Sequence, residues 1–534
     1  MRKITWLGIL GMASVVGAGC AESDDTSAPT SQETQSPVMT VLPALQHDIS
    51  QPLRDVPVDH SVTVKERKEH PIGRFKTPGP DLGDTVVQAA HSTSTNAATT
   101  TGLNVPGVGN GDFGFAPNAA PPDTNGVVGT TQYVQWVNES FAVFDKTTGA
   151  IAAGFPKNGN SIWAGFGGGC ETNNDGDPVV QFDKAAQRWI LTQFSVSTTP
   201  FLQCVAVSTT ADATGTYARY SFSYPNFPDY PKMGVWPDGY YISFNIFTNV
   251  FQGALACAYD RTAMLAGAAA TQVCFQQANT VASLLPSDLD GSTAPPAGSP
   301  NVFVGIASTT SLNQFKFHVD FATPANSTFT KGPAITVASF AEACNGGICI
   351  PQAGTKQQLD SLGDRAMYRL AYRNFGNHEA MVLSHSVAGA KVKGVATTGV
   401  RWYELRRPAG GDFSVFQQAT FAPDTTFRWM PSVAMDKVGD IAVGYSLSSA
   451  TTTPAIGYAT RTAADAPGIL ANEVVFKKGG GSQLTGLARW GDYSAMTIDP
   501  VDDCTFFFTS EYQKTNGTFN WSTQITSFKV AGCQ

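Results

Sequence analysis

The chain has 534 residues, only 14% of them charged, and a formal net charge of -8 with a pI near 5.4. The 52 glycines and 32 prolines favour many short strands joined by turns, either in one large all-β domain or in two or three smaller domains. The acidic balance and the lack of any basic stripe exclude nucleic acid as an expected partner.

The first twenty residues have the pattern of an export signal. Arg2 and Lys3 precede an apolar run, which ends in small residues directly before Cys20. The run is too short for a spanning helix. A cysteine at this place resembles the lipidation site of bacterial lipoproteins, although Gly17 stands where a branched residue is usual. We expect a lipid on Cys20 as the only membrane contact, with ordinary signal cleavage nearby as the alternative.

Eight further cysteines pair evenly in an exported chain. Consecutive pairing keeps every bridge inside one repeat unit, and the spacing fits no zinc site. The expected pairs are Cys170 with Cys204, Cys257 with Cys274, Cys344 with Cys349, and Cys504 with Cys533.

The segment 21–110 is rich in Ser, Thr, Pro, Asp and Gln and has few aromatic residues. Such a composition cannot bury enough apolar surface to fold compactly alone. We interpret the segment as a low-complexity tether followed by an extended arm lying on the domain. A removable pro-segment is the alternative.

The region 111–534 repeats one pattern, in which a turn carrying Asp or Arg precedes strands separated by tight turns. Seven such units are found, and the fourth is weak, with its first strand expected at 301–307. Four short strands per unit are the content of a propeller blade. The predicted fold is therefore an all-β propeller of seven four-stranded blades. Six or eight blades, a pair of β-sandwiches and a solenoid are the alternatives.

Three phrases in this region carry a resemblance: Pro-Pro-Asp-Thr-Asn-Gly, Gly-Asp-Pro-Val-Val and Arg-Trp-Gly-Asp-Tyr-Ser. They resemble a group of largely uncharacterised exported bacterial β-propeller-like proteins, over roughly residues 117–534. The resemblance implies export and the fold, and brings no reaction with it.

Acidic and basic residues recur where the units begin, and in a propeller these positions converge on the central channel. The candidate ligand-binding residues are Asp123, Asp177, Asp229, Asp364, Arg365, Arg428, Arg489 and Asp492. A ring of this kind would suit a glycan or a cation. The alternative is that each Asp caps a turn by accepting backbone N–H bonds, and repetition favours this second reading. Arg428 and Arg489 stand apart because each belongs to an Arg-Trp pair that begins a unit.

Calcium is the one candidate cofactor. Asn173, Asp175 and Asp177 place oxygen ligands densely around Gly176, as calcium loops require, without the spacing of an EF-hand. An ordinary Asx-rich turn is the alternative. Asp288-Leu289-Asp290-Gly291 is a weaker version and is read as part of a polar insertion.

Known hydrolase motifs are not found. The chain has neither a Gly-x-Ser-x-Gly elbow nor a sialidase Asp-box. We therefore expect a protein without catalysis that binds a glycan, peptide or protein partner in the periplasm or on the outer surface. A glycan-acting hydrolase or lyase that uses channel-facing Asp and Arg residues is the first alternative, and a structural envelope protein is the second.

Overall fold

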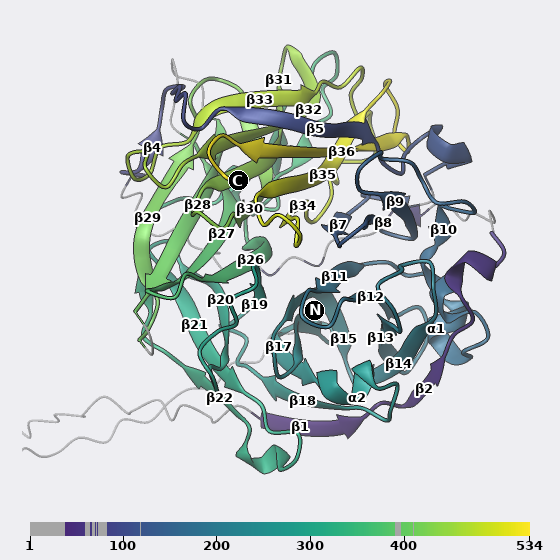
Figure 1. Ribbon diagram of the computed structural model, residues 1–534. Helices are drawn as coiled ribbons and strands as arrows, with labels where there is room; N and C mark the ends of the chain where they lie inside the picture. The colour runs from purple at the N-terminus through teal and green to yellow at the C-terminus, as the bar shows by residue number, and fades with distance from the viewer. Residues whose placement is uncertain are drawn as a thin grey trace, which may run out of the picture. The chain divides into compact units, whose positions relative to one another are not determined.

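The computed structural model describes residues 38–58, 65–66, 70, 72, 83–117, 119–389, 397–408 and 411–534. Contacts between Cα atoms divide the chain into two units, and the unit 37–534 contains all of these residues. The signal segment and Cys20 lie outside the described residues. Within this unit, seven blades surround a common centre, and two neighbouring blades are joined into one ten-stranded sheet (Figure 1).

Each blade is built in chain order from the centre outwards with antiparallel neighbours, and the inner strands of the fourth and fifth blades pair with each other in parallel. The innermost strands are β7 (Thr124–Val128), β11 (Val179–Asp183), β15 (Phe227–Val235), β19 (Leu285–Leu289), β26 (Met367–Asn374), β30 (Phe427–Met435) and β34 (Ala495–Ile498). The second strands are β8 (Gln132–Val137), β12 (Arg188–Ser195), β16 (Tyr240–Phe247), β20 (Asn301–Ser308), β27 (Glu379–Ala388), β31 (Ile441–Ser449) and β35 (Thr505–Gln513). The third strands are β9 (Ser140–Asp145), β13 (Phe201–Ser208), β17 (Phe251–Tyr259), β21 (Ser311–His318), β28 (Thr398–Arg407), β32 (Thr452–Arg461) and β36 (Trp521–Val530).

The fourth strands are β10 (Lys157–Asn158), β14 (Tyr217–Tyr224), β18 (Thr271–Gln276), β22 (Thr328–Lys331), β29 (Ser414–Phe421) and β33 (Ala471–Lys477). The fourth strand of the last blade is β5 (Thr99–Pro106), which comes from the N-terminal side of the first blade. The predicted propeller of seven four-stranded blades is confirmed.

Other N-terminal strands extend the blades. β1 (Val38–Pro43) pairs with β18, β2 (Gln46–Ile49) with β14, and β4 (Val87–Gln88) with β29. All of these strands, like β5, lie within the segment predicted as tether and arm. The predicted start of the folded domain at residue 111 stays a prediction.

The remaining elements are short. β3 (Lys65–Glu66) pairs with β6 (Ala119–Ala120), β24 (Ile348–Ile350) pairs with β25 (Leu359–Asp360), and β23 (Ile335–Thr336) pairs with β21. The helices are α1 (Gly168–Thr172) and α2 (Arg261–Leu265), with single 3-10 turns η1 (Leu53–Asp55), η2 (Asp112–Gly114), η3 (Gly159–Trp163), η4 (Pro324–Asn326) and η5 (Ala343–Gly346). In the described ranges, no helix is both long and apolar enough to span a bilayer.

The fourth blade differs from the prediction. The strand expected first, at 301–307, is the second strand β20, and the innermost strand is β19, which contains Asp288. Burying this carboxylate is possible because the Nε of Arg369 lies 2.8 Å from its Oδ2. The sequence alone suggested a polar insertion here, because the arginine that neutralises Asp288 lies 81 positions later in the chain.

Aromatic and branched residues explain the packing between blades. In β35, Phe506 and Phe508 lie on one face and are fully buried among Tyr458, Phe528 and Ile456 of neighbouring strands. Side chains alternate between the faces of a strand, so Phe507 packs on the other side against Tyr133. Each blade is therefore sandwiched between its neighbours, which is why the strands are apolar on both faces.

Candidate functional site at the centre of the propeller

The inner strands begin with a repeated backbone feature. In every blade one residue at or just before the inner strand has a positive φ, a conformation that non-glycine residues rarely adopt. These residues are Asp123 (43°), Asp177 (46°), Tyr230 (56°), Ser283 (46°), Leu362 (45°), Met430 (54°) and Gly491 (61°). Asp123 and Asp177, at two of these positions, bring their carboxylates together at one end of the inner strands.

Three carboxylates meet at this end. One oxygen each of Asp123, Asp177 and Asp492 lies within 4.8 Å of the others, and all three residues are buried. Asp123 is fixed from two sides, since its Oδ1 accepts the backbone N–H of Asp492 at 2.7 Å and its Oδ2 accepts the Nδ2 of Asn138 at 3.0 Å. Burial, then the charges of Asp492 and Asp177, raise the pKa of Asp123 well above its usual range. Asp123 is thus buried and fixed beside two other carboxyl groups.

An ammonium group lies among these acids. The Nζ of Lys232 is 3.4 Å from the ring centroid of Tyr230 and 4.1 Å from that of Tyr493. Burial lowers the pKa of Lys232 to about 8, against the opposing effect of Asp177, Asp492, Asp123 and Asp229. The cluster therefore contains its own cation, which is held by two aromatic faces.

Asp229 is the more accessible acid, with 14% of its side chain exposed. Burial and the charge of Asp177 raise its pKa well above the usual range, although Arg365 acts in the opposite direction. The Nδ1 of His70, from the N-terminal segment, lies 3.8 Å from Asp229 Oδ2, and the His70 ring packs edge-on against Phe227.

Two arginines form the remaining charged pairs. The Arg365 guanidinium donates to both carboxylate oxygens of Asp364, at 2.7 and 3.1 Å, and lies 4.9 Å from the ring centroid of Tyr230. Arg489 is ion-paired with Asp492. The structure thus brings together seven of the eight predicted ring residues.

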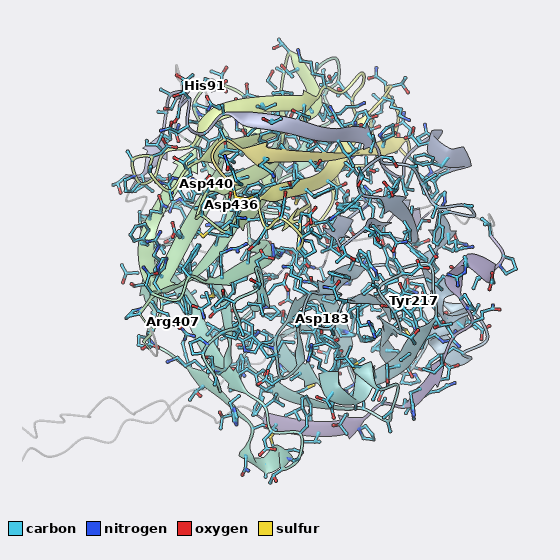
Figure 2. All side chains as sticks on the ribbon, viewed as in Figure 1. His91, Asp183, Tyr217, Arg407, Asp436 and Asp440 are labelled. Carbon is cyan, nitrogen blue, oxygen red and sulfur yellow. A yellow bond between two sulfur atoms is a disulfide. The ribbon has the colours of Figure 1, made fainter. Side chains whose placement is uncertain are left out.

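Arg428 is the eighth, and its partners are different. Its guanidinium is bound by Asp424 (2.9 Å) and Glu473 (2.7 Å), both of which also approach His91. Figure 2 shows His91 near the rim of the molecule and Asp183, the last residue of an inner strand, near the middle. The arginines of the two pairs that stood out in the sequence therefore belong to separate charged clusters, although Trp429 and Trp490 pack together with ring centroids 5.9 Å apart.

The predicted calcium loop is divided by the fold. Asp175 accepts the N–H groups of Val196 and Ser197, each at 2.7 Å, and Asn173 donates to the hydroxyls of Ser195 and Thr198. These contacts are those of an Asx-rich turn that binds its neighbouring loop. Only Asp177 of the three reaches the central carboxylates. A calcium ion stays an untested expectation.

Sequence reasoning missed two charged residues of the centre. Lys232 lies at the start of the third unit, in Asp229-Tyr230-Pro231-Lys232. The tyrosine and proline beside it were the one feature of the sequence that could have indicated its role. Glu511 is buried in β35 without a hydrogen-bond partner for either carboxylate oxygen among the described residues. Burial, opposed by the charge of Arg489, raises its pKa well above the usual range. An alternating strand of apolar and polar residues gave no indication of this acid.

The cysteines form the four predicted disulfides. Cys170 is bonded to Cys204, Cys257 to Cys274, Cys344 to Cys349, and Cys504 to Cys533. Disulfides persist in oxidising compartments, so the chain belongs outside the cytoplasm.

Comparison with known proteins gives structural matches alone: no family model and no curated protein matches the chain. An endo-arabinanase of family GH43 from Bacillus licheniformis is 9% identical, with 55% of this chain and 96% of the enzyme covered and a TM-score of 0.27. The polysaccharide lyase Uly1 is 10% identical over 84% of this chain and 98% of its own, at a TM-score of 0.36. A PL25 ulvan lyase is 11% identical, with 78% of this chain and 97% of the lyase covered and a TM-score of 0.33.

These findings correct one prediction and leave another open. The motif resemblance to exported bacterial proteins is not shown by any match. The expectation of a binding protein without catalysis is wrong, because the similar solved structures are glycoside hydrolases and polysaccharide lyases.

Proposed function

We propose that this protein is a glycan-acting enzyme that hydrolyses a glycosidic bond with the carboxyl groups at the centre of the propeller. The observation that carries the proposal is the group of carboxyl groups of Asp123, Asp177 and Asp492, which lie within 4.8 Å of one another, with Asp229 beside them and its pKa raised by burial and by the charge of Asp177. Glycoside hydrolysis needs one protonated and one ionised carboxyl group near the same bond. Environments that push two carboxyl groups to different protonation states assign the acid and the base.

The proposed roles follow from exposure and charge. Asp229 has the more exposed side chain and donates a proton to the glycosidic oxygen as the bond to the anomeric carbon breaks. Asp177 attacks that carbon or takes a proton from the attacking water. Asp123 stays fixed by its hydrogen bonds and positions Asp492 through that residue's backbone N–H. The Arg489 guanidinium and the Lys232 ammonium balance the charge of the cluster.

A lyase reaction is the second candidate, and Lys232 favours it. Elimination from a uronate needs a base that removes the proton next to the carboxylate and a cation that stabilises the resulting charge. An amine with a pKa of about 8 suits the first task near neutral pH, and Arg365 or Arg489 suits the second. This reaction requires a uronic acid in the substrate, whereas hydrolysis does not.

One experiment separates the candidates. The purified full-length chain is incubated with neutral and with uronate-containing polysaccharides, and products are followed as reducing ends and as the ultraviolet absorbance of unsaturated uronates. Hydrolysis gives the first signal alone, and elimination gives both. We expect D229N and D177N each to lower the rate about 10²–10⁴-fold, the usual range for loss of a general acid or base. D320N, on a surface turn of the fourth blade, is the matched control.

Two outcomes contradict the proposal. The first is product formation that D229N and D177N leave unchanged. The second is a lack of product on every glycan while both variants and the parent chain show the same thermal unfolding midpoint, because a correctly folded site would then be inactive.

We further propose that the enzyme is held at a membrane by a lipid on Cys20, with a glycan as its partner. Seventeen residues separate Cys20 from β1, which begins at Val38. The variant C20A should move the protein from the membrane fraction to the soluble fraction of the cell envelope. Unchanged membrane retention of C20A would contradict the lipid.

A further inference from the structure

Exposed apolar side chains are concentrated at the start of the folded unit. The described residues include thirteen exposed large hydrophobic side chains, and six of them lie on β1, on β2 or between the two strands. We name this group the apolar strip: Val38, Met39, Val41, Leu42, Leu45 and Ile49. Single exposed hydrophobic residues are normal on a soluble protein, but so many on one short segment of the chain indicate a contact surface.

β1 is also an open edge of its sheet. It pairs antiparallel with β18 on one side, from Val38 opposite Gln276 to Pro43 opposite Thr271. In the part of the chain that the structure describes, no strand pairs with its other side. Proteins protect such edges with lysine, proline or bulges, because unpaired N–H and C=O groups accept another strand. Residues 38–46 contain no charged side chain and one terminal proline, so this edge lacks that protection.

A small hollow continues the apolar surface. A cavity of about 220 Å³ lies beside β1, and its walls include Val38, Leu42, Tyr224, Ile246 and Leu255. An apolar side chain of a partner would fill this space. The open side of β1 therefore offers backbone hydrogen bonds for strand addition, and the cavity lies on the adjoining face of the sheet, inward of that edge.

We propose that β1 pairs antiparallel with β1 of a second copy of this chain. Two identical strands can pair around a twofold axis, so each edge supplies the partner groups for the other. The uncharged sequence brings no like charges together across the pair. The result joins two five-stranded third blades into one ten-stranded sheet.

The other possible occupants fit less well. A lipid surface would cover the apolar strip but would leave the outward N–H and C=O groups of β1 without partners. Residues 21–37 of the same chain are rich in Ser, Thr, Asp and Gln, and their polar side chains do not match the apolar pocket. A second β1 satisfies both the backbone and the side chains.

The test is the mass of the full-length C20A chain in solution, measured by light scattering over a range of concentrations. We expect a dimer. Replacing Val41 with lysine should weaken the dimer by about tenfold or more, because the twofold axis places the two new charges on adjoining strands. V38K is a second variant at a more exposed position, and V501K, at a side chain that is 65% exposed in another blade, is the matched control.

Three results would overturn the proposal. One is a monomer at every concentration. Another is a dimer whose dissociation constant is the same in V41K, V38K and the control V501K, since the contact would then lie elsewhere. The third is a monomeric chain that sediments with vesicles of phosphatidylethanolamine and phosphatidylglycerol and loses this binding in V41K, because a lipid surface would then cover the apolar strip.

Discussion

The four disulfides should stabilise the propeller in the order of the loops they close. Removing a bridge by replacing both cysteines with alanine frees the unfolded chain and so lowers the free energy of unfolding. The bridge between Cys504 and Cys533 closes 29 residues and holds the C-terminus in the last blade, whereas the bridge between Cys344 and Cys349 closes 5. The comparison of these two variants tests the effect of loop length.

The chain-entropy relation gives the magnitudes. A loop of 29 residues corresponds to about 3.6 kcal/mol at 25 °C and a loop of 5 residues to about 2.1 kcal/mol. The other two bridges close 34 and 17 residues and correspond to about 3.8 and about 3.1 kcal/mol. Cys504 and Cys533 are also buried, so their removal adds a packing loss of the same sign.

The assay is urea unfolding of the four double variants, followed by tryptophan fluorescence, with parent chain and variants at one protein concentration. We expect the variant without the bridge between Cys344 and Cys349 to have the smallest loss of unfolding free energy. A loss in this variant that equals or exceeds the loss without Cys504 and Cys533 would refute the reasoning. The slope against urea should be fitted for each variant, because a freed unfolded chain exposes more surface and raises the slope.

Two further predictions concern buried charges. R369M should lower the free energy of unfolding by about 3–5 kcal/mol, because it leaves the buried carboxylates of Asp288 and Asp290 without their guanidinium partner. R54M, which breaks an exposed ion pair, should lower the free energy of unfolding by less than about 1 kcal/mol. Equal losses for the two variants in urea unfolding would contradict this reasoning. Since the pKa of Lys232 is lowered to about 8 in the folded chain, the unfolded chain binds more protons above that pH, so the stability should rise from pH 8 towards the ordinary lysine pKa near 10.5. K232M should lack this part of the rise, and identical pH profiles of stability for K232M and the parent chain would show that the amine is not perturbed.

The architecture could be predicted from the sequence because each blade repeats a local pattern of turn and strand. The disulfide pairs followed for the same reason, since each bridge stays inside one unit. The fourth blade was misplaced because Asp288 is neutralised by Arg369, and such a pairing between distant residues leaves no local pattern. A strand that buries a charge cannot be told from a polar loop by periodicity alone.

The candidate site could be predicted in part. The acids at the unit starts converge because position within the repeat fixes position around the channel. Arg428 has the same sequence pattern as Arg489, yet Glu473 binds it elsewhere, and a partner 45 residues away is visible only in the fold. Lys232 was missed because its position depends on two aromatic rings, of which Tyr493 belongs to another blade.

The strand β5 has a consequence for how the chain folds. Its partner β36 is completed only when the chain has been almost wholly made, since Asn104 and Gln524 bond across 420 residues of sequence. Until then Thr99–Pro106 has no partner, and the first and last blades cannot be joined. Contacts this distant in sequence form slowly and leave unpaired edges exposed to other chains. We therefore expect truncation near the C-terminus to impair folding far more than its length suggests, because it prevents the ring from closing.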